Sequence, residues 1–255
     1  MCLEDYMKIA KANAFRKVPG LKRIVIPEGV VAIEPSTFFN CRELEEVVIP
    51  ESVQSIGEYA FGQCSKLKKM NLPCGLKNLG EVAFYRCCNL NMKVVIPEGV
   101  TVMPDGVFMQ SGITELHIPH MMRRVKDYVF SECGSLETVF FAEGCESIGY
   151  GAFRSCKMLR RVVLPSTLKE LGGSVFRNCT SLEEICIPSK NLSKISLSAF
   201  VCCYNLKRVL TMFGTFHFDR SDYPEYKRDG YEQDIGLDDV TFEPGVPEIY
   251  RNDKG

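Results

Sequence analysis

The chain has 255 residues, of which 45% are hydrophobic and 25% are charged, and its formal net charge at pH 7 is −1. A near-neutral chain gives no general electrostatic basis for binding nucleic acid or an anionic membrane surface. Nowhere do 18 apolar residues follow one another, so insertion into a membrane is not expected either.

The N-terminal residues 1–14 precede the regular part of the chain. Leu3, Met7, Ala10 and Ala14 have the spacing of one helical face. This pattern predicts an N-terminal cap that covers the first repeat, with a partner-binding helix as the alternative. The segment lacks the apolar core of a signal peptide. We therefore expect a cytoplasmic protein, or a surface or secreted one if the full gene carries an export signal that this chain lacks.

A repeat of about 23 residues fills the chain from residue 15 to residue 211. Residues 44–64, LEEVVIPESVQSIGEYAFGQC, show its template, L-x-x-I-x-I-P-x-x-V-x-x-I-G-x-x-A-F-x-x-C. The most regular landmark is a phenylalanine, at Phe15, Phe38, Phe61, Phe84, Phe108, Phe130, Phe153, Phe176 and Phe200. A leucine-rich repeat of this length indicates a solenoid in which each rung buries its face on the next.

Each rung is expected to contain one strand, one further inward ridge formed by V-x-x-I, and one turn. L-x-x-I-x-I predicts a short strand that ends at a proline, which cannot donate to a strand ladder. A-F-x-x-C predicts a single helical or 3₁₀ turn on the convex side. Strand four carries an extra residue between Leu90 and Ile96. The predicted fold is an α/β-type repeat solenoid, a leucine-rich-repeat horseshoe with a concave parallel β-sheet, about ten rungs and few regular helices.

Seven cysteines occupy one column of the repeat, three residues after the phenylalanine: Cys41, Cys64, Cys87, Cys133, Cys156, Cys179 and Cys203. A position that recurs in every rung points the same way each time, which predicts a stack of buried, reduced thiols that act as small hydrophobic side chains. No pair has C-x-x-C spacing. So many thiols fit a reducing compartment.

The period breaks at Met212. Residues 212–236 form an acidic, aromatic insertion, interpreted either as a cap folded over the last rung or as a binding loop. The template returns in degenerate form at 237–250, which predicts a tenth rung within a C-terminal segment, 237–255, that ends the solenoid.

The outward strand positions alternate in charge from rung to rung. Opposite charges face each other along most of the stack, for example at Glu46 beside Arg23, and the same pattern includes Arg161 and Arg208 beside Glu184. The sequence predicts a ladder of salt bridges that fixes register and neutralises the face, rather than a basic groove for nucleic acid.

A second outward column is largely apolar and is the candidate protein-binding stripe. Its members are Val25, Val48, Asn71, Val95, His117, Phe140, Val163, Cys186 and Leu210, and Arg161 and Arg208 border it. A contiguous apolar stripe on a concave surface is typical of a contact site. Ordinary strand propensity is the alternative explanation for its valines, but it explains Phe140 beside His117 less well.

Catalytic chemistry is not predicted. The chain contains none of the motifs G-x-S-x-G, G-x-x-x-x-G-K-S/T and G-x-G-x-x-G. His117 and His120 have no evident third ligand for a metal. We name no catalytic, cofactor-binding or metal-binding residue, and we expect no enzyme and no cofactor.

The repeats IPESVQSIGEYAFGQC at 49–64 and LPSTLKELGGSVFRNC at 164–179 resemble the BspA-like, treponemal-type leucine-rich repeat family. The resemblance covers roughly residues 14–211. It implies a bacterial or protist type of protein that binds other proteins, in adhesion to host proteins or other cells, and it supplies no catalytic residues. The expected function is a non-catalytic protein-binding scaffold that is monomeric or weakly homo-oligomeric. The alternative is a self-assembly module that uses its end rungs or the 212–236 insertion.

Overall fold

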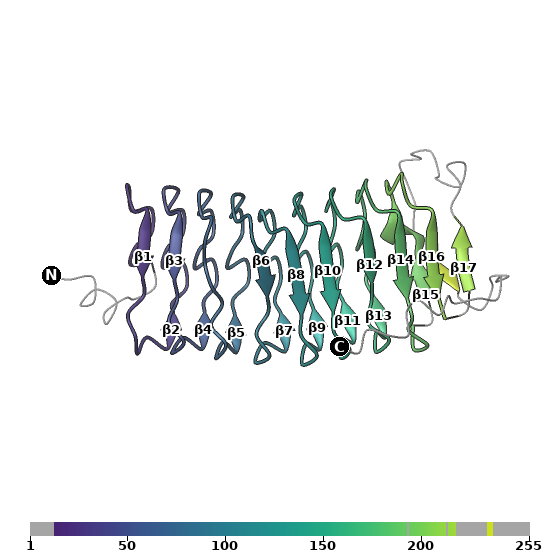
Figure 1. The fold of residues 1–255 in the computed structure, drawn as a ribbon, viewed down its shortest axis with the longest axis horizontal. Helices are drawn as coiled ribbons and strands as arrows, with labels where there is room; N and C mark the ends of the chain where they lie inside the picture. Colours follow the sequence, from purple (N-terminus) through teal and green to yellow (C-terminus); the bar gives the residue numbers. More distant parts are fainter. Residues whose placement is uncertain (1–12, 193, 213, 218–233, 237–255) are drawn as a thin grey trace.

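The computed structural model describes residues 13–192, 194–212, 214–217 and 234–236. Over these residues the chain winds into an elongated stack of rungs, as predicted for a leucine-rich-repeat solenoid (Figure 1). Each rung has three sides, and along most of the stack each side bonds to the same side of the neighbouring rung. The N-terminal cap expected at 1–14 lies almost entirely outside the described residues, and the tenth rung expected at 237–250 lies wholly outside them.

The first side is a parallel sheet, here called the front sheet. Its strands are β1 (Arg23–Val25), β3 (Glu46–Val48), β6 (Lys93–Val95), β8 (Glu115–Ile118), β10 (Thr138–Phe141), β12 (Arg161–Val163), β14 (Glu184–Ile187) and β16 (Arg208–Thr211). Paired residues occupy the same repeat position: Val139 of β10, for example, lies beside Val162 of β12. The columns that the repeat predicts are therefore the columns of the sheet.

The second side consists of shorter parallel strands, here called the back sheet. They are β2 (Ala32–Ile33), β4 (Ser55–Ile56), β5 (Asn78–Leu79), β7 (Val102–Met103), β9 (Arg124–Val125), β11 (Ser147–Ile148) and β13 (Glu170–Leu171). The second residue of each strand points into the core, which is the inward ridge expected from V-x-x-I.

The third side is a ladder of turns rather than a set of helices. The backbone N–H groups of Ser36, Phe38 and Asn40 donate to carbonyl oxygens of the next rung at 2.7–2.8 Å. The φ angles of Ser36 and Asn40 are 57° and 61°, outside the right-handed helical region. Every second N–H group therefore points to the neighbouring rung, and not along the turn as it would in a helix. The predicted helical or 3₁₀ turn is therefore wrong for most rungs. Among the described residues only Leu197–Phe200 (η1) forms a 3₁₀ helix.

Stacked phenylalanine rings fill the core behind this turn ladder. Neighbouring rings from Phe15 to Phe200 have centroids 5.1–6.3 Å apart, with planes within 18° of parallel. The rings from Phe38 to Phe176 are fully buried. Because each ring contacts one ring above and one below, the stack joins all the rungs.

The cysteine column packs beside the phenylalanine stack. Each thiol donates to the carbonyl oxygen of the phenylalanine one rung earlier, for example Cys64 to Phe38 at 3.1 Å and Cys156 to Phe130 at 3.2 Å. The one rung with serine in this column has Ser111, whose hydroxyl lies 3.4 Å from the sulfur of Cys133. Every cysteine from Cys41 to Cys186 is a free thiol.

We expect alkylation to separate these thiols by burial. In the native protein, iodoacetamide should label the exposed Cys74 and Cys88 at least about 100-fold faster than the buried Cys64, Cys133 and Cys156, because the buried thiols react only after local opening. Peptide mass spectrometry at timed quenches measures each rate. Stable disulfides, or labelling of Cys133 as fast as that of Cys88, would contradict the packing.

The parallel order ends at β16. The next strand, β17 (Gly214–His217), is antiparallel to it, and β18 (Asp234–Gly236) is antiparallel to β15 (Lys194–Ser196). The start of the 212–236 insertion therefore extends the front sheet through β17, and its end forms a separate two-stranded sheet with β15, whereas residues 218–233 lie outside the described part. Nowhere in the described part of the chain is there a helix long and apolar enough to span a bilayer.

Candidate functional site

The predicted stripe is exposed only over part of its length. Val25, Val95, Phe140 and Val163 are exposed, and Val48, Asn71 and His117 are partly buried. Cys186 and Leu210 are only 2% and 4% exposed, so placing them on an accessible surface was wrong. After β16 the chain leaves the repeat and turns back as β17. The repeat pattern therefore does not predict the surroundings of Cys186 and Leu210.

Four neighbouring strands bring the remaining centre of the stripe together. Val95, His117, Phe140 and Val163 lie side by side in register on β6, β8, β10 and β12, and we call them the central stripe. The ring centroids of His117 and Phe140 are 4.5 Å apart. Val95 and Phe140 are 55% and 50% exposed, which is unusual for large apolar side chains held on a rigid sheet.

Asn71 has a structural role that the column pattern did not indicate. Its side-chain amide oxygen accepts from the Ile49 backbone N–H at 2.9 Å, and its amide nitrogen donates to the Ile49 carbonyl oxygen at 2.6 Å. Both bonds hold this side chain against the preceding rung. The central stripe therefore begins after Asn71.

The flank on the N-terminal side of the strands is the predicted salt-bridge ladder. Arg23 pairs with Glu46 at 3.1 Å and Lys93 pairs with Glu115 at 3.0 Å. The predicted site residues Arg161 and Arg208 both pair with Glu184, whose side chain is largely buried. The exposed pairs Arg23–Glu46 and Lys93–Glu115 each contribute only about 0.2–1 kcal/mol to stability, so the ladder mainly fixes register and neutralises charge.

Glu115 connects this ladder to the stripe. Its carboxylate accepts from Lys93 and lies 2.5 Å from Nε2 of His117. The hydrogen bond from Lys93, followed by the one from His117, lowers the pKa of the Glu115 carboxyl. The charged carboxylate holds the imidazole in place against the ring of Phe140.

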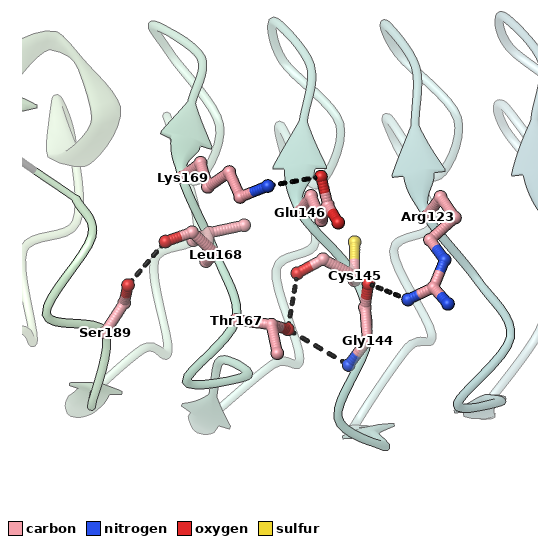
Figure 2. Close-up of polar contacts among 8 residues, drawn as sticks. All are labelled: Arg123, Gly144, Cys145, Glu146, Thr167, Leu168, Lys169 and Ser189. Atoms are coloured by element: carbon pink, nitrogen blue, oxygen red, sulfur yellow. Dashed lines mark hydrogen bonds and ion pairs between the residues drawn. The ribbon is translucent and has the colours of Figure 1, made fainter.

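The flank on the C-terminal side of the strands is acidic and tightly cross-linked. Glu98 lies 3.2 Å from the ring of His120, and Glu143 accepts from Ser166 of the next rung. Figure 2 shows the residues that follow Glu143 and Ser166 in the chain, where the Thr167 hydroxyl accepts from the Gly144 N–H at 3.0 Å and donates to the Cys145 carbonyl oxygen at 2.9 Å. These bonds join consecutive rungs, so the surface beside the stripe is preorganised.

A second exposed aromatic pair was not identified from the sequence. Tyr128 and Tyr150 form an edge-to-face contact with centroids 5.4 Å apart on the turn ladder, and they are 36% and 41% exposed. The sequence feature that could have identified this pair is a tyrosine two or three residues before the repeat phenylalanine in two consecutive rungs. This pair is an alternative contact surface.

No metal site is evident in the part of the chain that the structure describes, where no three metal-ligating side chains cluster. His117 and His120 instead face carboxylates at Glu115 and Glu98. The arrangement offers an apolar and aromatic contact surface between two charged flanks.

Comparison with solved structures finds similar proteins. The crystal structure of a leucine rich cell surface protein from Faecalibacterium prausnitzii is 22% identical to this chain, with a TM-score of 0.51, and the match covers 86% of this chain and 63% of that one. A leucine-rich repeat protein from Bacteroides ovatus is 25% identical, with a TM-score of 0.47, and the match covers 80% of this chain and 64% of that one. The chain therefore spans less than two thirds of these two relatives. No curated protein matches significantly.

The fold and the column pattern define a leucine-rich-repeat protein. The BspA type leucine rich repeat region matches in six copies, over residues 8–137 and 101–220. The chain belongs to the BspA-type leucine-rich repeat family, as its resemblance to that family predicted.

Proposed function

We propose that this protein is a non-catalytic scaffold that binds another protein through the central stripe. The observation that carries the proposal is Phe140, half exposed between His117 and Val163 on a sheet whose neighbouring turns are cross-linked. Large aromatic side chains on rigid surfaces commonly supply most of the affinity of an interface.

The charges around the stripe indicate what kind of protein surface fits. Arg160 and Arg161 lie on one flank, and the exposed carboxylates of Glu98 and Glu143 lie on the other. A complementary partner presents an apolar centre with acidic side chains toward the arginines and basic side chains toward the glutamates. Such complementarity increases the association rate and fixes orientation more than it adds affinity.

Adhesion at a cell surface is the setting that we propose for this contact. One solved relative is described as a leucine rich cell surface protein. The buried thiols suit this setting as well as a reducing compartment, because burial shields them from oxidants. Labelling intact cells with a membrane-impermeant amine reagent tests it. Labelled protein is expected, whereas protection until the cells are lysed would place the protein inside.

The binding surface is tested with two matched double variants. His117→Glu/Phe140→Glu places two carboxylates on the central stripe, and Tyr128→Glu/Tyr150→Glu places two on the turn ladder. With a partner captured by the wild type, identified by mass spectrometry and purified, we expect the first variant to weaken Kd by at least about 100-fold. The second should change Kd by less than about threefold.

Circular dichroism first establishes that both variants fold as the wild type does. If the turn-ladder variant loses binding and the stripe variant keeps it, the tyrosine pair is the interface and the proposal is wrong. If neither variant loses binding and sizing shows concentration-dependent oligomers, the self-assembly alternative is favoured.

A further inference from the structure

The bonding between rungs is interrupted at one place, between rung three (residues 66–88) and rung four (residues 89–112). Within the front sheet, the strands from β6 to β17 form one hydrogen-bonded group, and β1 and β3 form another (Figure 1). Between these groups rung three has no strand of its own, and its Lys69 forms a single bridge back to Glu46. The back sheet divides at the same place into β2-β4-β5 and β7-β9-β11-β13. We call this place the seam.

On the front side, the extra residue of strand four breaks the pairing. In the regular rungs the residue before each strand donates back to the previous rung, as Thr114 does to Met92. In rung four the N–H groups of Asn91 and Met92 bond instead to Asn89 and Leu90 of their own rung. Leu72 occupies the position from which Ile49, Ile96 and Leu164 donate to the next rung. Within the described residues its N–H donates no hydrogen bond to the next rung.

On the back side, a proline removes the donor. The N–H groups of Gly57, Gly80, Lys126, Gly149 and Gly172 each donate to the previous rung at 2.7–3.0 Å. Pro104 stands in this column in rung four and has no N–H to offer to Leu79. In the first rung this column holds Glu34, which follows Ile33 as Gly57 follows Ile56.

The charge pattern fails at the same place. Lys69 and Lys93 occupy consecutive positions of the column in which Arg23, Glu46 and Lys69 otherwise alternate. Lys93 pairs with Glu115 of the following rung, whereas Lys69 forms no ion pair within the described residues. Two like charges in neighbouring rungs are unfavourable where opposite charges elsewhere stabilise the stack.

The turn ladder and the core continue across the seam, and at the end of the turn ladder the Gly112 N–H donates to the Cys87 carbonyl oxygen at 3.0 Å. Val82, Phe84 and Arg86 donate to Asp105, Val107 and Met109 at 2.8–3.0 Å. The rings of Phe84 and Phe108 remain stacked at 5.1 Å. Two sides of the seam therefore lack backbone bonds while the third side keeps them, which is the arrangement of a hinge.

We propose that the seam divides the solenoid into two cooperative units, residues 13–88 and residues 89–217, which can open on the strand side about the turn ladder. In a repeat protein the coupling between neighbouring rungs sets cooperativity, so the weakest interface separates the units. The central stripe lies wholly in the second unit, so the first unit can open without disturbing it.

Hydrogen exchange with mass spectrometry on the full chain tests the division. We expect peptides from β1, β3 and β4 to exchange together, at least about tenfold faster than peptides from β8, β10 and β12, with a step at the seam. A smooth gradient of protection from the N-terminal end, or uniform protection across residues 46–163, would overturn the proposal.

A repair variant separates the seam from ordinary fraying of the end rungs. Pro104→Ala restores a backbone donor on the back side of the seam, so protection of β1, β3 and β4 should rise at least about tenfold and the step should disappear. The control Pro35→Ala removes a proline just after the first described back strand, away from the seam, and should leave the step unchanged. A repair variant that folds but keeps the step would show that the seam does not set the boundary.

Discussion

Phe84→Ala is expected to lower the free energy of unfolding by about 3–5 kcal/mol, as is usual when a fully buried phenylalanine is truncated. The ring is fully buried between Phe61 and Phe108, with centroids 5.4 and 5.1 Å away. A rigid stack above and below cannot collapse into the space, so the cavity persists. Phe84 also belongs to the one side that crosses the seam, so its loss should weaken the coupling between the two units.

Urea denaturation followed by circular dichroism measures this loss, since the chain contains no tryptophan to serve as a fluorescence probe. The matched control is Tyr85→Ala, which truncates the partly buried neighbouring ring that lies under Arg86. Its expected cost is about 1 kcal/mol, because little buried volume is removed. A loss below about 1 kcal/mol for Phe84→Ala would mean that the phenylalanine column is not the core.

The repeat predicted the columns of the structure because a fixed period places equivalent residues one above another. Phe61, Cys64 and Glu46 each lie where their position in the template indicates, and the salt-bridge ladder follows from the same rule. The thiol–carbonyl bonds were not predicted, because they depend on the exact path of the turn. That path requires positive φ at residues such as Asn40, which no periodicity reveals.

The candidate site was predicted in outline and corrected in detail. Period-two alternation correctly placed Val95, His117 and Phe140 on one outward column. It could not show that Asn71 turns its amide onto Ile49, or that Cys186 becomes buried where the repeat ends. An alternation rule assigns a face to a side chain, whereas neighbouring polar groups and the chain beyond the repeat decide whether that side chain is accessible.

The extra residue before Ile96 was visible in the sequence, but its consequence was not. One added residue alone is compatible with a bulge inside a continuous sheet. The stack is interrupted on two sides because Pro104 also removes a donor from the back sheet in the same rung, which becomes apparent only when the two sides are aligned.

Alkaline pH is expected to destabilise the protein steeply. Burial raises the pKa of Cys133 to about 12 and also raises the pKa of Cys64, Cys87 and Cys156. Above about pH 9 the unfolded chain loses these protons while the folded protein keeps them, so the free energy of unfolding falls as pH rises. This contribution to stability is complete below the ordinary thiol pKa. It is lost at about 1.4 kcal/mol per pH unit for each thiol, or roughly 5 kcal/mol per unit for four.

Lysine and tyrosine side chains also titrate near pH 10, so the comparison between variants isolates the thiols. Cys133→Ser places in the column the residue that Ser111 already provides one rung earlier. Urea titrations at intervals between pH 8 and pH 11 should show its stability falling less steeply than that of the wild type, by about 1.4 kcal/mol per pH unit. Cys88→Ser removes a thiol that is exposed in the folded protein and should leave the slope unchanged. Equal slopes for all three proteins would mean that water reaches the cysteine column, and the close packing of that column would then be wrong.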